Sequence, residues 1–102
     1  MGLRDLIEDE TFRSKTPMYI GEWNFSAFHG FILGYSYNAK AYDLKVMDGF
    51  NQFVAQYYNW YESTAGWRGI IFKEMNNDHR KSIETFFILY DLFAGRTARL
   101  DK

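Results

Sequence analysis

The sequence contains no cysteine, a single proline and only two histidines. Without cysteine the chain can form neither a disulfide nor a thiolate zinc site, which fits the reducing cytoplasm. No apolar run approaches the roughly 20 residues of a membrane span. Acidic residues interrupt residues 1–10, so this stretch lacks the apolar core of a signal peptide. We therefore expect a cytoplasmic protein that binds no membrane, no metal and no cofactor.

The chain also lacks a charge imbalance. Twelve basic and thirteen acidic residues give a net charge of −1, so no overall field favours a polyanion. Nucleic-acid binding would need a basic face interleaved with aromatic side chains. Arg80 and Lys81 form the only adjacent basic pair. The sequence therefore predicts no nucleic-acid partner.

Catalytic motifs are missing as well. His29 and His79 lie far apart and in separate predicted helices, which favours a structural role for each. The sequence contains no H-E-x-x-H motif, no P-loop and no G-x-S-x-G motif. An active site assembled in space from distant residues leaves no such motif, but nothing here points to one. We expect a protein that is not an enzyme.

What the chain does have is aromatic side chains, which make up 21% of its 102 residues. This length is typical of one domain, so we interpret residues 1–102 as a single domain. Large rigid rings would fill its core. A chain this short has little room to bury all of them, so some should reach the surface, where Tyr and Trp are effective contact residues.

The segment 17–42 carries the longest regular pattern. Its apolar residues recur at steps of three and four, which predicts a central helix over 25–40; they are Phe25, Phe28, Ile32, Tyr35 and Ala39. Asn24 or Ser26 can cap its start. The opposite face contains Gly30 and Gly34, which either admit another backbone or are tolerated surface positions.

Four further segments complete the expected fold. The pattern predicts a short helix over 2–13 and a third helix near 49–61 that Asp48 caps. The stretch from Trp67 favours a helix, with a strand as the alternative. Asp78 should cap a last helix that Gly95 ends, leaving a frayed tail over 96–102. The sequence thus predicts an all-α fold, a small single-domain helical bundle of four to five helices.

The turn before the central helix is expected to be extended. Pro17 disfavours helix at the preceding Thr16, and Met18 and Ile20 should point inward. Gly21 allows the backbone to reverse.

The run Pro17-Met18-Tyr19-Ile20-Gly21-Glu22 is followed by an aromatic helix ending in Gly34-Tyr35. Later come Gly66-Trp67, Ile70-Ile71 and a final amphipathic helix. In this order the motifs, which span most of the chain, resemble small bacterial immunity proteins encoded beside contact-dependent or Rhs-type polymorphic toxins. Relatives often carry a basic residue directly before the proline, where this chain has Thr16. The resemblance implies a protein that neutralises a cognate toxin C-terminal domain, commonly a nuclease, by forming a stoichiometric complex.

Such a complex would use aromatic anchors and carboxylates against a basic toxin surface. The candidate partner-binding residues are Glu22, Trp23, Tyr58, Trp60, Tyr61, Glu62, Glu84 and Asp91. Glu84 and Asp91 lie seven apart on one helix face, and Glu84 can also pair with Arg80. For the aromatics the alternative is core packing, and for the carboxylates it is a solvated face. The alternative function is a helical adaptor or self-associating subunit, with Ile88 and Leu92 as the seam of a weak homodimer.

Overall fold

The computed structural model describes residues 3–37, 47, 49–60 and 66–100, with side chains omitted for 36, 37 and 96–100. The described residues form seven α-helices and no strand. The all-α prediction is confirmed, and the described helices outnumber the four to five expected. The additional helices come from the first 20 residues, where two predictions were wrong.

The predicted helix over 2–13 is two helices, α1 (Leu3–Glu8) and α2 (Glu10–Ser14). They are separated at Asp9, whose backbone is extended, with φ −75° and ψ 123°. The Asp9 carboxylate accepts the N–H of Phe12 at 2.9 Å. An aspartate that bonds the backbone in this way starts a new helix, because it replaces the missing bond of the first turn.

The expected extended turn at Pro17 is also helical, as α3 (Thr16–Ile20). Proline is tolerated in a first helical turn because the N–H that it lacks would have no partner there. Met18 is 78% exposed, so its predicted inward position is wrong, while Ile20 does pack against the core. Gly21 reverses the chain with a φ of 94°, as predicted.

The central helix is α4 (Phe25–Tyr37), and residues 38–40 of the prediction lie outside the described part. Its stripe is confirmed, since Phe25, Phe28 and Ile32 are buried. Asn24 caps it by accepting the N–H of Ala27 at 2.8 Å. A Cβ added at either glycine of the opposite face, position 30 or 34, would meet no atom of the described residues within 4 Å beyond the helix's own backbone. Within the described part of the chain, these glycines are therefore tolerated positions with no other backbone packed against them.

Helices α6 (Phe50–Tyr57) and α7 (Trp67–Glu74) follow. α6 ends earlier than the predicted residue 61, because Asn59 takes a left-handed conformation with φ 62°. The predicted cap at Asp48 lies outside the described residues. For the segment from Trp67 the helix interpretation is confirmed.

The last helix, α8 (His79–Leu100), begins as predicted. The Asp78 carboxylate accepts the N–H of Lys81 at 2.8 Å. Its predicted end at Gly95 is wrong, because the helix continues to Leu100. Among the described residues only Gly21 and Gly49 combine glycine with a positive φ, so Gly95 does not adopt the left-handed geometry of a helix stop.

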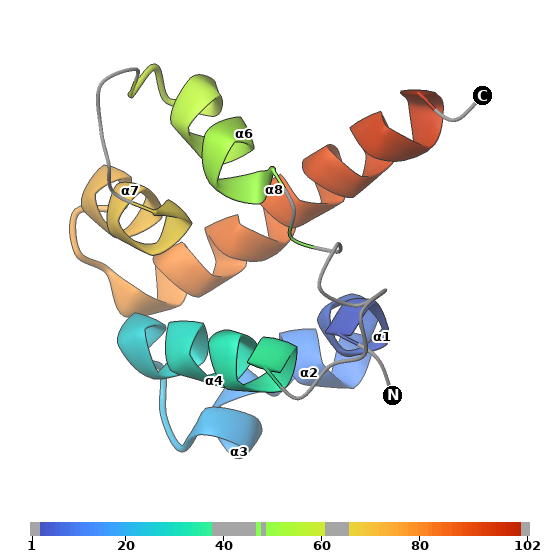
Figure 1. The fold of residues 1–102 in the computed structure, drawn as a ribbon. Helices are drawn as coiled ribbons and strands as arrows, with labels where there is room; N and C mark the ends of the chain where they lie inside the picture. Colours follow the sequence, from blue (N-terminus) through green and yellow to red (C-terminus); the bar gives the residue numbers. More distant parts are fainter. Residues whose placement is uncertain (1–2, 38–46, 48, 61–65, 101–102) are drawn as a thin grey trace.

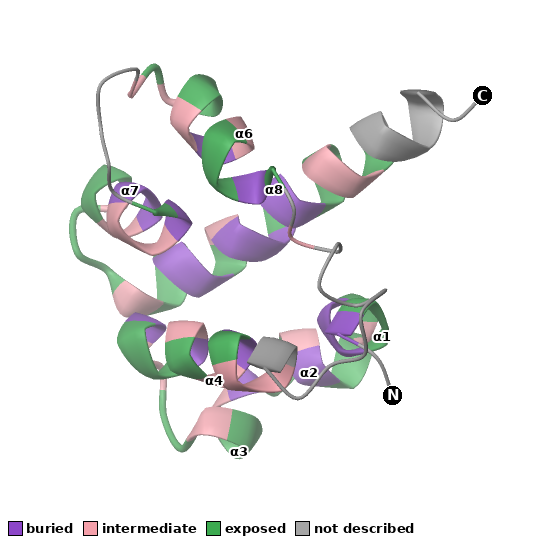
Figure 2. Cartoon of the chain, viewed as in Figure 1, coloured by how far each residue is buried: buried purple, intermediate pink, exposed green. Residues whose placement is uncertain are grey.

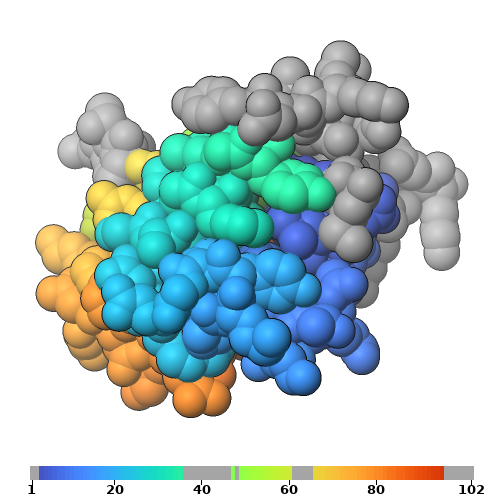
Figure 3. All heavy atoms as spheres, turned by 90° about the horizontal axis from the view of Figure 1, so that it is seen from below, coloured from blue at the N-terminus to red at the C-terminus, as the bar shows by residue number. Residues whose placement is uncertain are grey.

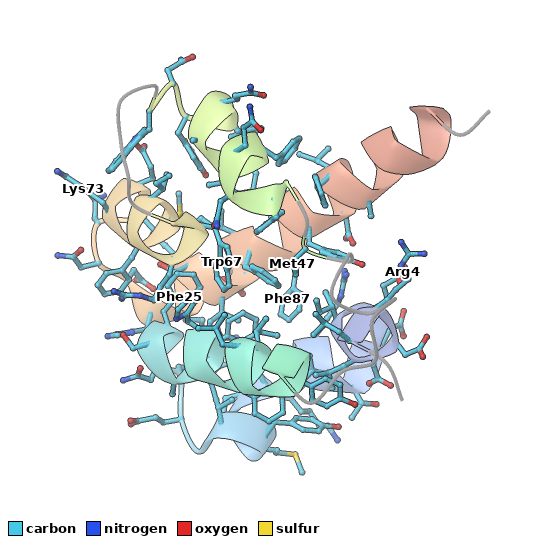
Figure 4. The ribbon with its side chains drawn as sticks, viewed as in Figure 1. Arg4, Phe25, Met47, Trp67, Lys73 and Phe87 are labelled. Carbon is cyan, nitrogen blue, oxygen red and sulfur yellow. The ribbon has the colours of Figure 1, made fainter. Side chains whose placement is uncertain are left out.

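α8 crosses the molecule, with α6 and α7 on one side and α4 with α1–α3 on the other (Figure 1). The buried residues of α8 lie along the part of the helix that passes between these two groups (Figure 2), and α8 contacts α4, α6 and α7. The core between them is largely aromatic, and Phe25, Trp67 and Phe87 point into it from three helices (Figure 4). Seen from below the view of Figure 1, α3 and α4 form one face of the molecule, and α7 and the start of α8 lie beside α4 (Figure 3).

Candidate partner-binding surfaces

The C-terminal end of α6 and the adjacent end of α7 form an aromatic surface, here called the Trp60 surface and comprising Tyr57, Tyr58, Trp60, Lys73 and Glu74. The Trp60 indole donates its Nε1–H to Glu74 Oε1 at 2.8 Å. The Lys73 ammonium lies 5.6 Å from the centroid of the same ring, within the range of a cation–π contact. Two neighbours from α7 thus fix the orientation of a partly exposed tryptophan.

The turn that follows α6 brings Trp60 to this position. The left-handed Asn59 redirects the chain, and the N–H of Trp60 returns to the carbonyl of Ala55 at 2.8 Å. The Tyr57 and Tyr58 rings meet edge to face, 4.9 Å apart. Tyr57 is 53% exposed, whereas burial raises the pKa of Tyr58. The surface therefore combines an exposed ring with two rings that are held by packing.

A second group, here called the Trp23 surface, joins the turn before α4 to the start of α8 and comprises Glu22, Trp23, Arg80 and Glu84. The Arg80 guanidinium lies 4.8 Å above the Trp23 ring. The same guanidinium pairs with Glu84 at 3.8 Å, the i,i+4 pair that the sequence predicted. Both charged side chains are more than half exposed, and such a pair is worth about 0–1 kcal/mol. The side chains of the Trp23 surface thus have defined contacts but remain exposed to solvent.

The two surfaces border the same turn. Glu74 is the last residue of α7 and Arg80 is the second of α8, so only residues 75–79 separate them in the chain. In space α7 contacts both α6 and α4, which carry the two tryptophans at their ends. Lys73 projects outward from this edge in Figure 4. Five of the eight candidate residues therefore flank the α7–α8 turn.

Asp91 belongs to neither surface. Its two carboxylate oxygens accept from Arg13 at 2.7 and 2.8 Å. Arg13 also donates to the carbonyl of Ile7 at 2.7 Å and lies 4.9 Å from the centroid of the Phe87 ring. The bond from Arg13 lowers the pKa of Asp91. Asp91 therefore takes part in a set of contacts, centred on Arg13, that joins α1, α2 and α8.

Tyr61 and Glu62 lie outside the described residues. Lys73 and Glu74, which hold Trp60, were not among the candidates. Glu74 falls on the otherwise apolar stripe of its helix but is exposed, so its position alone did not indicate the bond to Trp60. The sequence carried no signal for Lys73 either.

Both histidines make structural contacts. His29 is half-buried with its ring 5.0 Å from that of Trp67, and burial, aided by Arg68, lowers its pKa. His79 accepts the backbone N–H of Phe25 at 2.9 Å. In the described part of the chain, no three His, Cys, Asp or Glu side chains are placed to hold a metal ion.

One hollow of about 460 Å³ lies at the first two helices, lined by Glu8, Glu10, Arg13 and Ser14. Beside the same helices, the Tyr90 hydroxyl is buried without a hydrogen bond among the described residues. Burial raises the pKa of this hydroxyl, and the nearby Arg4 lowers it by a smaller amount. The Arg4 side chain does not form a hydrogen bond with the hydroxyl. The hollow is open and lies apart from both tryptophan surfaces.

Searches against protein-family models, curated proteins and solved structures found no match for this chain. None of the helices that the structure describes is both long and apolar enough to span a bilayer.

Proposed function

We propose that this protein is an immunity protein, which binds a cognate bacterial toxin domain and neutralises it in a one-to-one complex. The observation that carries the proposal is the Trp60 surface, joined to the resemblance of the sequence motifs. Tyr, Trp and Arg dominate the binding energy of protein interfaces when they are presented as rigid anchors. Trp60 is such an anchor, because Lys73 and Glu74 fix its ring before any partner arrives.

The preformed geometry lowers the cost of association. Ordering a loose side chain at an interface costs about 0.5–1.5 kcal/mol, and a ring that is already held avoids most of this. The exposed ring of Tyr57 adds contact area beside it. The partner would dock on the edge that flanks the α7–α8 turn, with the Trp60 surface as the anchor and the Trp23 surface at the rim.

The carboxylates of this edge suit a basic partner. Glu22 and Glu84 are both exposed, and a toxin nuclease needs a basic site to hold its substrate. Rim charges mainly set the rate of association. That rate should fall as salt rises, because the Debye length shortens from about 10 Å at 0.1 M to about 3 Å at 1 M.

The test is co-expression with the C-terminal toxin domain encoded by the neighbouring gene. Cells with the wild-type protein should survive, and the purified pair should form a one-to-one complex. Trp60→Ala should raise Kd by about 30-fold or more, which corresponds to about 2 kcal/mol. Met18→Ala is the matched control, since Met18 is a large exposed side chain on α3, outside both surfaces. It should leave Kd unchanged.

Two results would contradict the proposal. Equal killing with and without the folded protein would remove the immunity function. If the complex forms but both variants bind equally, the function stands and the Trp60 surface is wrong. Circular dichroism of each variant excludes a loss of folding as the cause.

The second candidate, a self-associating helical adaptor, has one supporting observation. Ile88 and Leu92 lie one turn apart on α8 and are 60% and 48% exposed, as the sequence predicted for a seam. Two side chains supply far less than the roughly 800 Å² per partner of a standard interface. Any dimer through them is therefore weak, and sedimentation of Ile88→Glu against wild type at high concentration tests it.

A further inference from the structure

His79 connects three helices through one side chain. It is the first residue of α8, and its Nδ1 accepts the backbone N–H of Phe25, the first residue of α4, at 2.9 Å. Its ring also packs against Phe72 of α7, with the centroids 5.0 Å apart. The imidazole thus takes the place of a capping side chain for one of the free N–H groups at the start of α4.

This bond exists in one protonation state only. A ring nitrogen that accepts a hydrogen bond carries no proton, so the imidazole must be neutral with its hydrogen on Nε2. An imidazolium has two N–H donors and no acceptor. On protonation, Nδ1–H and the N–H of Phe25 would face each other as two donors, and the contact would turn from attractive to repulsive.

The surroundings add to this repulsion. The starts of α4 and α8 meet at His79, and a helix N-terminus concentrates positive partial charge. The ionisable residues nearest in the chain are Asp78, Arg80 and Lys81 around His79, and Glu22 and His29 around Phe25. From α7, Arg68 donates to Ser26, the residue after Phe25, at 3.4 Å. Several are already engaged, since Asp78 caps α8 and Arg80 both stacks on Trp23 and pairs with Glu84. The nearby side chains therefore carry charges of both signs. The hydrogen bond from Phe25 to Nδ1 decides whether protonation of His79 stabilises or weakens the contact.

We propose that His79 is a pH-sensitive latch for the start of α4. Protonation of its imidazole releases the N–H of Phe25 and loosens the turn that carries Glu22 and Trp23. Histidine is the side chain whose charge ordinarily changes between pH 5 and 8, so this is the range over which the latch is tested. The Trp23 surface is built from both sides of this contact, because Trp23 precedes α4 and its partner Arg80 follows His79. The latch holds for the protein alone and does not rest on the proposed function.

The test is nuclear magnetic resonance on the whole chain. At pH 7.5 the imidazole nitrogen shifts of His79 should report the Nε2–H tautomer. Between pH 7.5 and 5.0 the exchange protection factor of the Phe25 amide should fall by about tenfold or more. That of the Lys81 amide should stay constant, because its acceptor is a carboxylate oxygen of Asp78 and not a ring nitrogen of His79.

Two variants separate the latch from general acid sensitivity. His79→Asn places a side-chain oxygen where Nδ1 was and cannot titrate, so it should keep the protection of Phe25 at both pH values. His29→Gln removes the other histidine and should leave the response unchanged. An Nδ1–H tautomer at pH 7.5, or a Phe25 amide whose protection is the same at both pH values in wild type, would overturn the proposal. These two measurements need no variant, so they stand even if a substitution prevents folding.

Discussion

Phe28 is a side chain whose removal should be strongly destabilising. It is fully buried on α4 and its ring pairs with four others at centroid distances of 5.0–6.0 Å; they are Phe12, Phe25, Phe86 and Phe87. These partners come from α2, α4 and α8, so one ring joins both ends of the described chain. Phe28→Ala deletes the ring and leaves a cavity where three helices meet.

The magnitude follows from the lost contacts. Truncation of a buried Phe to Ala costs about 3–5 kcal/mol, including the cavity term. The upper half of that range applies here, because each aromatic pair is worth about 0.5–1.5 kcal/mol beyond its buried area. Typical total stabilities are about 5–15 kcal/mol. The melting temperature of a domain this size should therefore fall by at least about 16 °C.

The assay is urea unfolding followed by circular dichroism, with Leu33→Ala as the control. Leu33 lies on the same helix but is 37% exposed, so its truncation should cost about 0.5 kcal/mol or less. If the two variants differ by less than about 1 kcal/mol, the packing described for α4 is wrong.

Two further predictions concern α8. Asp91→Asn should cost about 0–1 kcal/mol at pH 7, as for an exposed ion pair. Because Arg13 lowers the pKa of Asp91 below that of the unfolded chain, the pair stabilises above the ordinary aspartate range and is lost as pH falls below about 4. The gap between wild type and variant in urea unfolding should then close, and a gap that widens in acid would contradict the pairing. Gly95→Ala should raise the unfolding free energy by about 0.5–1 kcal/mol, because Gly95 lies inside a helix with open space around it. A loss of stability in the same assay would instead place the helix end at Gly95, as the sequence suggested.

The buried stripes were predictable because they depend on local periodicity. Phe25, Phe28 and Ile32 follow the 3.6-residue repeat, and burial enforces the same repeat in the fold. The helix starts at Asn24 and Asp78 were also predictable, since a capping side chain acts within three residues of its own position.

The errors arose where one residue type has two local roles. Asp9 lies within a helix-like pattern yet caps a new helix. Pro17 can either stop a helix or begin one. Gly95 can end a helix, but α8 continues through it to Leu100. In each case the residue type permits both roles, so the local pattern does not decide between them.

For the candidate surfaces, residue types were predictable and partners were not. The sequence indicated Trp23 and Trp60 as amphipathic aromatics beside predicted turns. The contacts that orient them come from Arg80 and Glu74, which lie far along the chain. The bond from Arg13 to Asp91 spans 78 residues. Nothing in the sequence ties such pairs together without the fold.

The central position of α8 has a consequence for how the chain matures in the cell. The Phe87 ring of α8 packs on Phe28 of α4. The ribosome adds Phe87 59 residues after Phe28, which at about 5–20 residues per second takes roughly 3–12 seconds. During that interval the aromatic face of α4 has no α8 to cover it, and exposed aromatic surface is prone to aggregation. Nascent chains of this protein should therefore be chaperone clients until α8 emerges, and the native core closes only when α8 packs between the other helices.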